Sequence, residues 1–515
     1  MNRRMVRWLM CGCLLMAVGG RAWAQAVPVP IGLFAEHADV GTVLHPGSVV
    51  YDAAKHSYTI RGSGENVWAT ADAFQFVWKK MEGDFTLTAD ISVLGQGGDP
   101  HKKAMLMARQ SLDADSAYAD VALHGVGLTS LQARDAKGAD THEIQSNISA
   151  PKRLRLQKYG DEFTMWLAGE DGVFRFSGAA MRVPLTGQFY VGLGVCAHNK
   201  DAVETAEFGR VRLEAAPAPA QKFGVLETVA VGSTDRRVTH VGSLGIGAPN
   251  WTRDGASLLF SERGRIESIS VMGGEPKLVL DRETPLSAYA FQNISPDGTT
   301  LAITEDTEDG ASVIAVLPIG GGKPRRVTAG WPTSEWPSWS PDGKSILFLG
   351  DRGGPLGLYA IVVSSGDEKR LSSQAAYEDA EYSPDGQHIY YASRASGAYE
   401  IWRMKPDGSQ PEQVTHDGVG KWFPHVSPNG REIAFLTPEF GEAISPLDTA
   451  PVALRVLSLD DGKIRVVARF VGDLRSMPVS SWSPDSTRLA FVSYEGLGSF
   501  ETRRQPGDRG PAVVK

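Results

Sequence analysis

Apolar and polar residues alternate at every second position through much of the N-terminal part of the chain. In residues 84–93 (DFTLTADISV), the apolar side chains fall on one face of an extended strand. The same period of two recurs in residues 153–157, 162–167 and 210–213. Such runs, separated by glycine-rich turns, are typical of antiparallel strands that bury one face. The pattern therefore predicts a two-sheet β-sandwich over residues 27–214.

A repeated tetrapeptide organises the rest of the chain. Its copies read Ser-Pro-Asp-Gly or a variant of it, at residues 252–255, 295–298, 340–343, 383–386, 427–430 and 483–486. The third positions of successive copies are 43, 45, 43, 44 and 56 residues apart, close to the length of a four-stranded propeller blade. Proline presets φ, aspartate bonds its own backbone and glycine supplies the positive φ that closes the turn. The repeat predicts an all-β, six-bladed β-propeller over residues 222–495.

The ends of the predicted propeller indicate how its ring closes. After Asp485 there is one hydrophobic strand, residues 488–494, and no outer strands follow it before the polar tail, residues 496–515. Segments that match the missing strands, residues 226–231 and 237–239, precede the first turn. We therefore expect these segments to complete the last blade, because closure removes the open edges of a sheet.

On this repeat, which includes Trp-Ser-Pro-Asp-Gly at residues 339–343, the chain resembles the periplasmic TolB propeller family. The resemblance covers about residues 222–494 and implies the fold more specifically than the function, because one propeller architecture hosts scaffolds, lyases, hydrolases and peptidases. TolB itself is a non-catalytic partner protein of the cell envelope. Its N-terminal domain is α/β, whereas the N-terminal segment here is strand-patterned, and this departure argues against TolB proper.

The N-terminal segment has a resemblance of its own. Residues 66–68, 83–87, 103–109 and 118–123 follow the order of strands in a concanavalin-like jelly roll. The segment is similar to domains attached to carbohydrate-active proteins. An Ala/Pro linker, residues 215–221, separates it from the propeller.

The first 24 residues read as a cleavable secretory signal. Arg3, Arg4 and Arg7 precede an apolar run, and Ala22-Trp-Ala24 has small residues at the expected cleavage site. We expect a periplasmic or secreted protein with no membrane span after signal removal. Removing the signal takes the formal net charge from −8 to −12, which disfavours nucleic-acid binding. It leaves one cysteine, Cys196, so no internal disulfide is expected.

No recognised catalytic motif occurs in the sequence. A phosphate loop, paired-cysteine metal motif, zinc-protease motif and nucleophile elbow are all missing, so no cofactor and no metal are predicted. The remaining candidates lie in the loops that a propeller gathers at one mouth of its channel, where they either grip a polar ligand or serve as packing and solvated loop. These candidate ligand-binding residues are Trp331, Glu335, Tyr377, Glu378, Asp379, His416, Asp417, Trp422 and Arg475.

Two further groups leave alternatives open. His416 and His425 either ligate a metal together with Asp417 or bond their own loop. In the sandwich, Arg109, Asp120 and His124 either line a sugar-binding face or form its solvent face.

Two functions fit these observations. The first is a non-catalytic binding or scaffold protein whose partner is an oligosaccharide or an envelope protein or peptide. The alternative is a carbohydrate-active lyase or glycoside hydrolase with its site at the propeller mouth, where a pair of carboxylates would favour the glycosidase. The sequence gives no oligomeric state.

Overall fold

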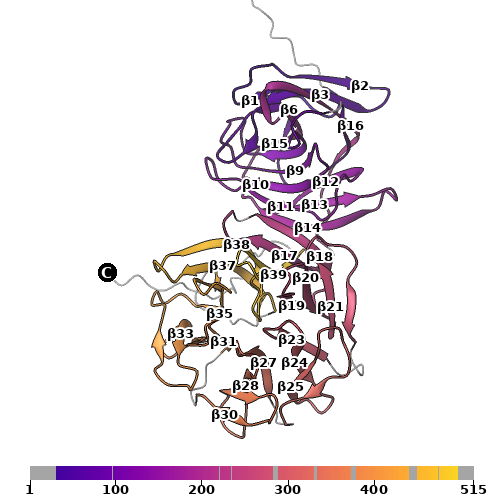
Figure 1. The fold of residues 1–515 in the computed structure, drawn as a ribbon. Coiled ribbons are helices and arrows are strands. Elements are labelled where there is room, and N and C mark those ends of the chain that lie inside the picture. The colour runs from indigo at the N-terminus through magenta and orange to yellow at the C-terminus, as the bar shows by residue number, and fades with distance from the viewer. Residues whose placement is uncertain are drawn as a thin grey trace, which may run out of the picture.

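The computed structural model describes residues 31–94, 97–219, 221–233, 235–281, 288–329, 333–372, 378–439, 449–473 and 475–496. Within these ranges the regular secondary structure is entirely β, with no helix. The strands form two units, one above the other in Figure 1. The predicted signal and the polar tail after residue 496 lie outside the described residues.

Two sheets packed face to face make up the N-terminal unit. The first contains, in spatial order, β1 (Glu36–Val40), β6 (Phe74–Met81), β15 (Phe189–Cys196), β8 (Lys103–Arg109), β9 (Tyr118–His124), β10 (Thr129–Arg134) and β11 (His142–Gln145). The second contains β14 (Phe174–Arg182), β13 (Glu162–Ala168), β12 (Arg153–Tyr159), β7 (Phe85–Leu94), β16 (Asn199–Glu214), β3 (Ser57–Gly64) and β2 (Ser48–Asp52). A short hairpin, β4 (Val67–Trp68) and β5 (Ala71–Asp72), stands apart from both.

The hydrophobic core of this unit lies between its two sheets. Phe85 and Leu87 of β7 are fully buried there, and so is Val121 of β9 from the facing sheet. The predicted alternation in residues 84–93 therefore corresponds to a strand with one face in the core.

Five four-stranded antiparallel sheets follow along the chain and lie around a ring (Figure 1). Their strands are β19 (Ile246–Trp251), β20 (Ser257–Glu262), β21 (Arg265–Ser270) and β22 (Lys277–Leu280); β23 (Ala288–Ile294), β24 (Thr300–Asp306), β25 (Ser312–Pro318) and β26 (Arg325–Arg326); β27 (Ser334–Trp339), β28 (Ser345–Gly350), β29 (Gly357–Val362) and β30 (Glu368–Arg370); β31 (Glu378–Tyr382), β32 (Ile389–Ser393), β33 (Glu400–Met404) and β34 (Glu412–Gln413); and β35 (Trp422–Val426), β36 (Glu432–Pro438), β37 (Ala450–Ser458) and β38 (Ile464–Gly472).

The repeated tetrapeptide forms the tight turn between the first two strands of each sheet. In the copy that starts at Ser340, the Oγ donates to Asp342 Oδ1 at 2.6 Å, and Asp342 Oδ1 accepts from the backbone N–H of Lys344 at 3.1 Å. The glycine that ends this copy, Gly343, has a φ of 69°, in the left-handed region that favours glycine. The last copy has Ser486 instead, at a φ of 62°.

Tryptophans next to these turns join neighbouring blades. The buried indole of Trp339 donates its Nε1–H to the carbonyl of Asn293 in the preceding sheet at 3.1 Å. Trp482 donates in the same way to the carbonyl of His425 at 2.9 Å. A hydrogen bond between the indole and the main chain thus recurs at the blade interfaces.

The strands expected to close the ring do pair with each other. β17 (Phe223–Ala230) pairs antiparallel with β39 (Arg488–Glu495) on one side and with β18 (Arg236–Gly242) on the other. At the centre of this group, the fully buried Glu227 receives two hydrogen bonds from the guanidinium of Arg236, at 2.7 and 3.0 Å, and one from Ser493 Oγ at 2.7 Å. These strands are not a separate sheet, because they continue the first sheet of the sandwich.

The continuation runs through β11, which pairs in parallel with β18 and makes one ten-stranded sheet of the two units. Val225 and Val238 of the closing strands belong to the sandwich core. Gly178 of β14 has a φ of 88° and lies so close that an added Cβ would be 2.8 Å from Val238 Cγ1. The contact between the sandwich and the propeller is therefore a shared sheet backed by a shared core.

Candidate functional site

The mouth of the propeller is formed by the loops that join neighbouring sheets and by the turns between second and third strands. Two of its predicted ligand-binding residues, Trp331 and Tyr377, lie outside the described residues. Glu378 and Asp379 are the first two residues of β31. The described part of the mouth is thus built by the ends of β24, β27 and β33 and by the loops before β35 and after β38.

Two carboxyl groups meet at the mouth between the second and third sheets. Asp306 ends β24 and accepts a hydrogen bond from Ser312 Oγ, through its Oδ1, at 3.0 Å. Glu335 of β27 lies beside the same hydroxyl. Burial raises the pKa of both carboxyls, and for Glu335 the negative charge of Asp306 adds to the increase. Neither has an ion-pair partner among the described residues.

The loop before β35 differs from the Asp306–Glu335 region because its carboxylates are paired with a lysine side chain. His416 and Asp417 are exposed there. The buried ammonium group of Lys421 lies 2.9 Å from Glu400 Oε2 and also pairs with Asp417. Asp417 is therefore occupied by a lysine of its own loop, which lowers the pKa of its carboxyl against the opposing effect of partial burial.

Trp422 and His425 are placed inside the blades and not at the surface of the mouth. Trp422, predicted to bind ligand, is 3% exposed and packs in the core between the fifth sheet and the closing strands. His425 is fully buried, with Nδ1 3.0 Å from Glu381 Oε2 and Nε2 2.9 Å from the carbonyl of Met477. Its two ring nitrogens are thus used between blades. In the described part of the chain, no group of three or more His, Cys, Asp or Glu side chains is arranged to hold a metal ion.

Arg475 lies after β38 and is paired locally. Its Nη2 is 2.5 Å from Asp473 Oδ2, and its Nη1 donates to the carbonyl of Leu244 at 3.0 Å. The guanidinium also stands 5.2 Å from the centre of the Tyr494 ring. The charge of Arg475 is thus matched by Asp473, whereas Asp306 and Glu335 have no ion-pair partner among the described residues.

In the sandwich, Arg109 is a structural residue and does not line an open face. Its side chain is fully buried, 3.4 Å from Asp72 Oδ2, and it donates to the carbonyls of Ser111 and Asp113 at 2.7 and 2.6 Å. Asp72 also receives two hydrogen bonds from the fully buried Arg134, at 2.8 and 3.0 Å. The β4–β5 hairpin, which contributes Asp72, therefore covers this end of the sheet face.

Asp120 and His124 share the same sheet face with Lys103, but they are buried too. Both oxygens of Asp120 are without a hydrogen-bond partner in the structure, and burial raises the pKa of this carboxyl well above its usual value. The Lys103 ammonium donates to Asn66 Oδ1, the carbonyl of Val67 and Gln132 Oε1 at 3.1, 2.7 and 3.1 Å. Arg109, Asp120 and His124 therefore lie on one sheet face, as predicted, but that face is buried and carries a polar network instead of a sugar-binding or solvent face.

The His124 ring should make the protein sensitive to acid. Burial lowers the pKa of His124 to about 3, and the nearby positive charge of Lys103 contributes to the decrease. A depressed histidine pKa means that the unfolded chain binds the proton more readily. The contribution of neutral His124 to the free energy of unfolding should therefore be fully present above the ordinary histidine pKa of about 6.5. It should decrease as the pH falls toward 3, by up to about 1.4 kcal/mol per pH unit. Urea unfolding at pH 7, 5.5 and 4 should show a smaller decrease for His124→Gln than for the wild type.

The exposed His416 provides the matched control for that measurement. His416→Gln should leave the pH dependence of unfolding unchanged. If the free energy of unfolding of His124→Gln fell with decreasing pH as steeply as that of the wild type, groups other than His124 would cause the acid sensitivity.

The comparisons with known proteins agree with the ring of sheets, which defines a β-propeller protein. A family model described as the TolB beta propeller domain matches residues 246–468. The chain is 36% identical over 248 residues to the uncharacterized protein Atu1656 of Agrobacterium fabrum, spanning 48% of this chain and 84% of that protein. A solved structure, a putative TolB from Agrobacterium tumefaciens, is 32% identical with a TM-score of 0.50, covering 54% of this chain and 99% of the other. The chain belongs to the TolB-like β-propeller family.

A more distant similarity is limited to a fragment. The uncharacterized peptidase YuxL of Bacillus subtilis is 29% identical over 152 residues, which is 27% of this chain but only 20% of that protein. Its name therefore gives no activity to this chain.

Proposed function

We propose that the protein is an exported, periplasmic binding or scaffold module without catalytic activity, which holds a glycan or an envelope protein at the propeller mouth. In this proposal the closing strands β39, β17 and β18 form a sixth blade, completed by the bridge between Trp482 and Leu489. The sandwich is a concanavalin-like domain fused to that blade. No described helix is long and apolar enough to cross a membrane.

The observation that supports the site is the Asp306–Glu335 pair. Two partly buried carboxyls lie beside one hydroxyl and have no cation partner in the described part of the mouth. Keeping them there costs stability, because a raised pKa means that the charged form is less favourable in the folded state than in the unfolded chain. Such unfavourable placements are concentrated at functional sites. A ligand with hydroxyl groups or an ammonium group would supply the missing donors.

The same pair favours the second candidate function. Glycoside hydrolases use two carboxyl groups, one of them kept protonated by a raised pKa so that it acts as a general acid. Asp306 and Glu335 have the raised pKa that this role requires. The alternative of a carbohydrate-active enzyme therefore rests on the same residues, and only product formation separates it from binding.

The double variant Asp306→Asn/Glu335→Gln tests the site. A screen of neutral oligosaccharides and lysine-containing envelope peptides by thermal shift should find a ligand that stabilises the wild type, since binding only to the native state raises apparent stability. The double variant should lose that shift. Its own melting temperature at pH 7 should equal or exceed that of the wild type, because the contribution of the neutral carboxyls is lost as the pH rises through their raised pKa values.

Asp407→Asn is the matched control, because Asp407 is an exposed turn residue on the opposite face of the propeller. The control should keep the ligand shift. Retention of the shift in the double variant would place the ligand elsewhere, and release of a shortened sugar by the wild type would establish the enzyme instead.

A further inference from the structure

A second candidate site lies at the other end of the propeller strands, between the first four-stranded sheet and the closing strands. The pocket there has a volume of about 290 Å³, just below the roughly 300–1,000 Å³ typical of ligand sites. Residues of two tetrapeptide turns line it, and these turns lie at the strand ends opposite the mouth. Its lining residues from the first sheet are Trp251, Asp254, Gly255, Val271 and Met272, and those from the closing strands and their turn are Thr228, Arg237, Ser483, Pro484, Asp485 and Arg488.

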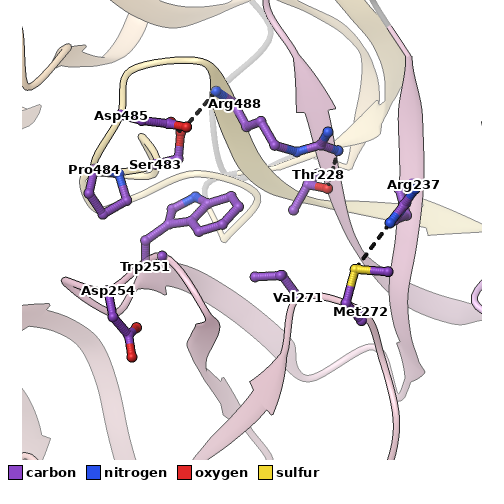
Figure 2. Close-up of a pocket in the computed structure, with 11 residues that line it drawn as sticks. Thr228, Arg237, Trp251, Asp254, Val271, Met272, Ser483, Pro484, Asp485 and Arg488 are labelled. Carbon is purple, nitrogen blue, oxygen red and sulfur yellow. Dashed lines mark hydrogen bonds between the residues drawn. The ribbon is translucent and has the colours of Figure 1, made fainter.

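Closure of the ring brings two arginines to this pocket. In the registers of β17 with β18 and with β39, Thr228 pairs with Arg237, and Arg488 lies two positions before the partner of Thr228. Both arginines are therefore on the sheet face that packs toward Trp251. Figure 2 shows the Arg488 side chain reaching Thr228 and the Arg237 side chain directed at Met272, on the same side of the pocket.

Neither arginine has a carboxylate partner among the described residues. Arg488 donates from Nη2 to Thr228 Oγ1 at 2.6 Å, and Arg237 donates to Gln145 Oε1 at 3.0 Å and to the Met272 sulfur at 3.2 Å. Burial lowers the pKa of Arg488, and the positive charge of Arg237 contributes to the decrease. Arg236, the residue before Arg237 in the chain, is by contrast paired with a carboxylate, with its Nη2 2.7 Å from Glu227 Oε1.

The two aspartates of the lining are used by their own turns. Asp254 Oδ1 accepts from Thr252 Oγ1 at 2.6 Å and from the N–H of Ala256 at 3.0 Å. Asp485 Oδ1 accepts from Ser483 Oγ at 2.6 Å and from Thr487. No ion pair joins either aspartate to Arg237 or Arg488. Both aspartates stay charged, but their oxygens serve the turns, so the arginine N–H groups that Thr228, Gln145 and Met272 do not use are available to a ligand.

The rest of the pocket is apolar or already hydrogen-bonded. Trp251 uses its Nε1–H on the carbonyl of Ser481 at 2.9 Å, and its ring lies near Val271 and Pro484 in Figure 2. Met272 is 64% exposed at the rim. A sugar would find few free polar partners on this surface, whereas an aliphatic side chain would fit it. A ligand that combines one anionic group with an apolar side chain matches both halves of the site.

We propose that this pocket binds the C-terminal carboxylate of a peptide chain whose last residue is aliphatic. The carboxylate lies between Arg237 and Arg488, which provide the paired N–H donors that carboxylates prefer. The last side chain packs against Trp251, Val271 and Met272. Because Arg237 also bonds Gln145 of the sandwich, the bound chain end lies at the junction of the two units. This site is independent of the mouth and of the function proposed there.

Calorimetric titration at low ionic strength with two matched peptides tests the proposal. The probes are acetyl-Gly-Ala-Leu with a free carboxylate and the same peptide as a carboxamide. The free acid should bind at least about 10-fold more tightly, a difference of about 1.4 kcal/mol, because the carboxamide lacks the negative charge that strengthens hydrogen bonds from a guanidinium. Equal binding of the two peptides would overturn the proposal.

Variants locate the binding. Arg488→Gln should abolish the preference for the acid, and Met272→Asp should abolish binding by placing a carboxylate beside Arg237 without disturbing the core. Arg253→Gln, on the same turn face one blade interface away, should bind like the wild type. If Arg488→Gln and Met272→Asp both still bound the free acid more tightly than the carboxamide, the proposed site would be wrong.

Two further probes separate the sources of the carboxylate. Sodium acetate should bind much more weakly than the tripeptide acid, and sodium glucuronate should not bind better than it. Acetate binding as well as the tripeptide would mean an adventitious ion only. Tighter binding of glucuronate would identify a sugar acid as the ligand and contradict the peptide.

Discussion

Replacing Glu227 with alanine should lower the free energy of unfolding by about 3–5 kcal/mol, the cost of removing one partner from a buried ion pair. Glu227 is fully buried, where it receives the guanidinium of Arg236 and the hydroxyl of Ser493. Alanine leaves the guanidinium of Arg236 without its counter-charge at the centre of the closing strands. Urea unfolding followed by tryptophan fluorescence measures the change.

The control for this variant is Glu412→Ala. Glu412 pairs with Arg403 at 2.8 Å across the two outer strands of the fourth sheet, but its side chain is 61% exposed. Exposed pairs of this kind contribute about 0–1 kcal/mol. Equal effects of the two variants would show that the buried pair of Glu227 and Arg236 contributes no more to stability than an exposed pair.

Asp72→Asn should have an effect of similar or larger size in the sandwich. The substitution keeps the shape of the side chain but removes the negative charge that Arg109 and Arg134 share. All three side chains are fully buried, so two guanidiniums would remain in the interior without a counter-ion, at a cost of at least about 3–5 kcal/mol. Loss of the near-ultraviolet circular dichroism signal or a large decrease in the urea midpoint would record it.

Asp113→Asn is the matched control in the same unit. Asp113 pairs with Lys137 at 2.7 Å, and both side chains are more than half exposed. We expect no large change in the urea midpoint, because an exposed ion pair contributes little to stability. A stable Asp72→Asn variant would mean that the hairpin holds its place without this charge.

The sequence predicts the architecture well where the signal is local and repeated. Each tetrapeptide encodes its own turn, so the spacing of the turns indicates the succession of sheets. The missing strands after Asp485 made the pairing of residues 226–231 with residues 488–494 predictable, and β17 does pair with β39. The count of six blades stays a prediction, because the structure gives five separate sheets and a closing group merged with the sandwich.

The site residues were harder to predict because side-chain direction depends on details that the pattern does not contain. The sequence pattern places Trp422 in a loop, but β35 starts at this residue and is irregular before His425, with Phe423 at a φ of 57°. The tryptophan therefore turns into the core. Arg109 and Asp120 were placed on one sheet face, as they are, but nothing in the alternation indicated that the β4–β5 hairpin covers that face.

The two arginines of the pocket between the first four-stranded sheet and the closing strands are hard to predict for a different reason. Arg237 and Arg488 are far apart in the sequence, and each occurs in a strand whose pattern explains it as a blade residue. Applying the predicted ring closure to the charged positions of both strands would have brought them together. That step requires the register of the strands as well as their pairing, and the register comes from the structure.

The shared ten-stranded sheet has a consequence for the order of folding. Glu227 and Ser493 meet across 266 residues of chain, and contacts of such high sequence separation form slowly because the loop entropy is lost before they are made. When the chain emerges N-terminus first, β18 can already pair with β11, and Val225 and Val238 can already enter the sandwich core. The sandwich then presents β17 as a fixed template, with its edge open until β39 arrives. The folded sandwich thus positions β17 before β39 pairs with it in the last step of propeller formation.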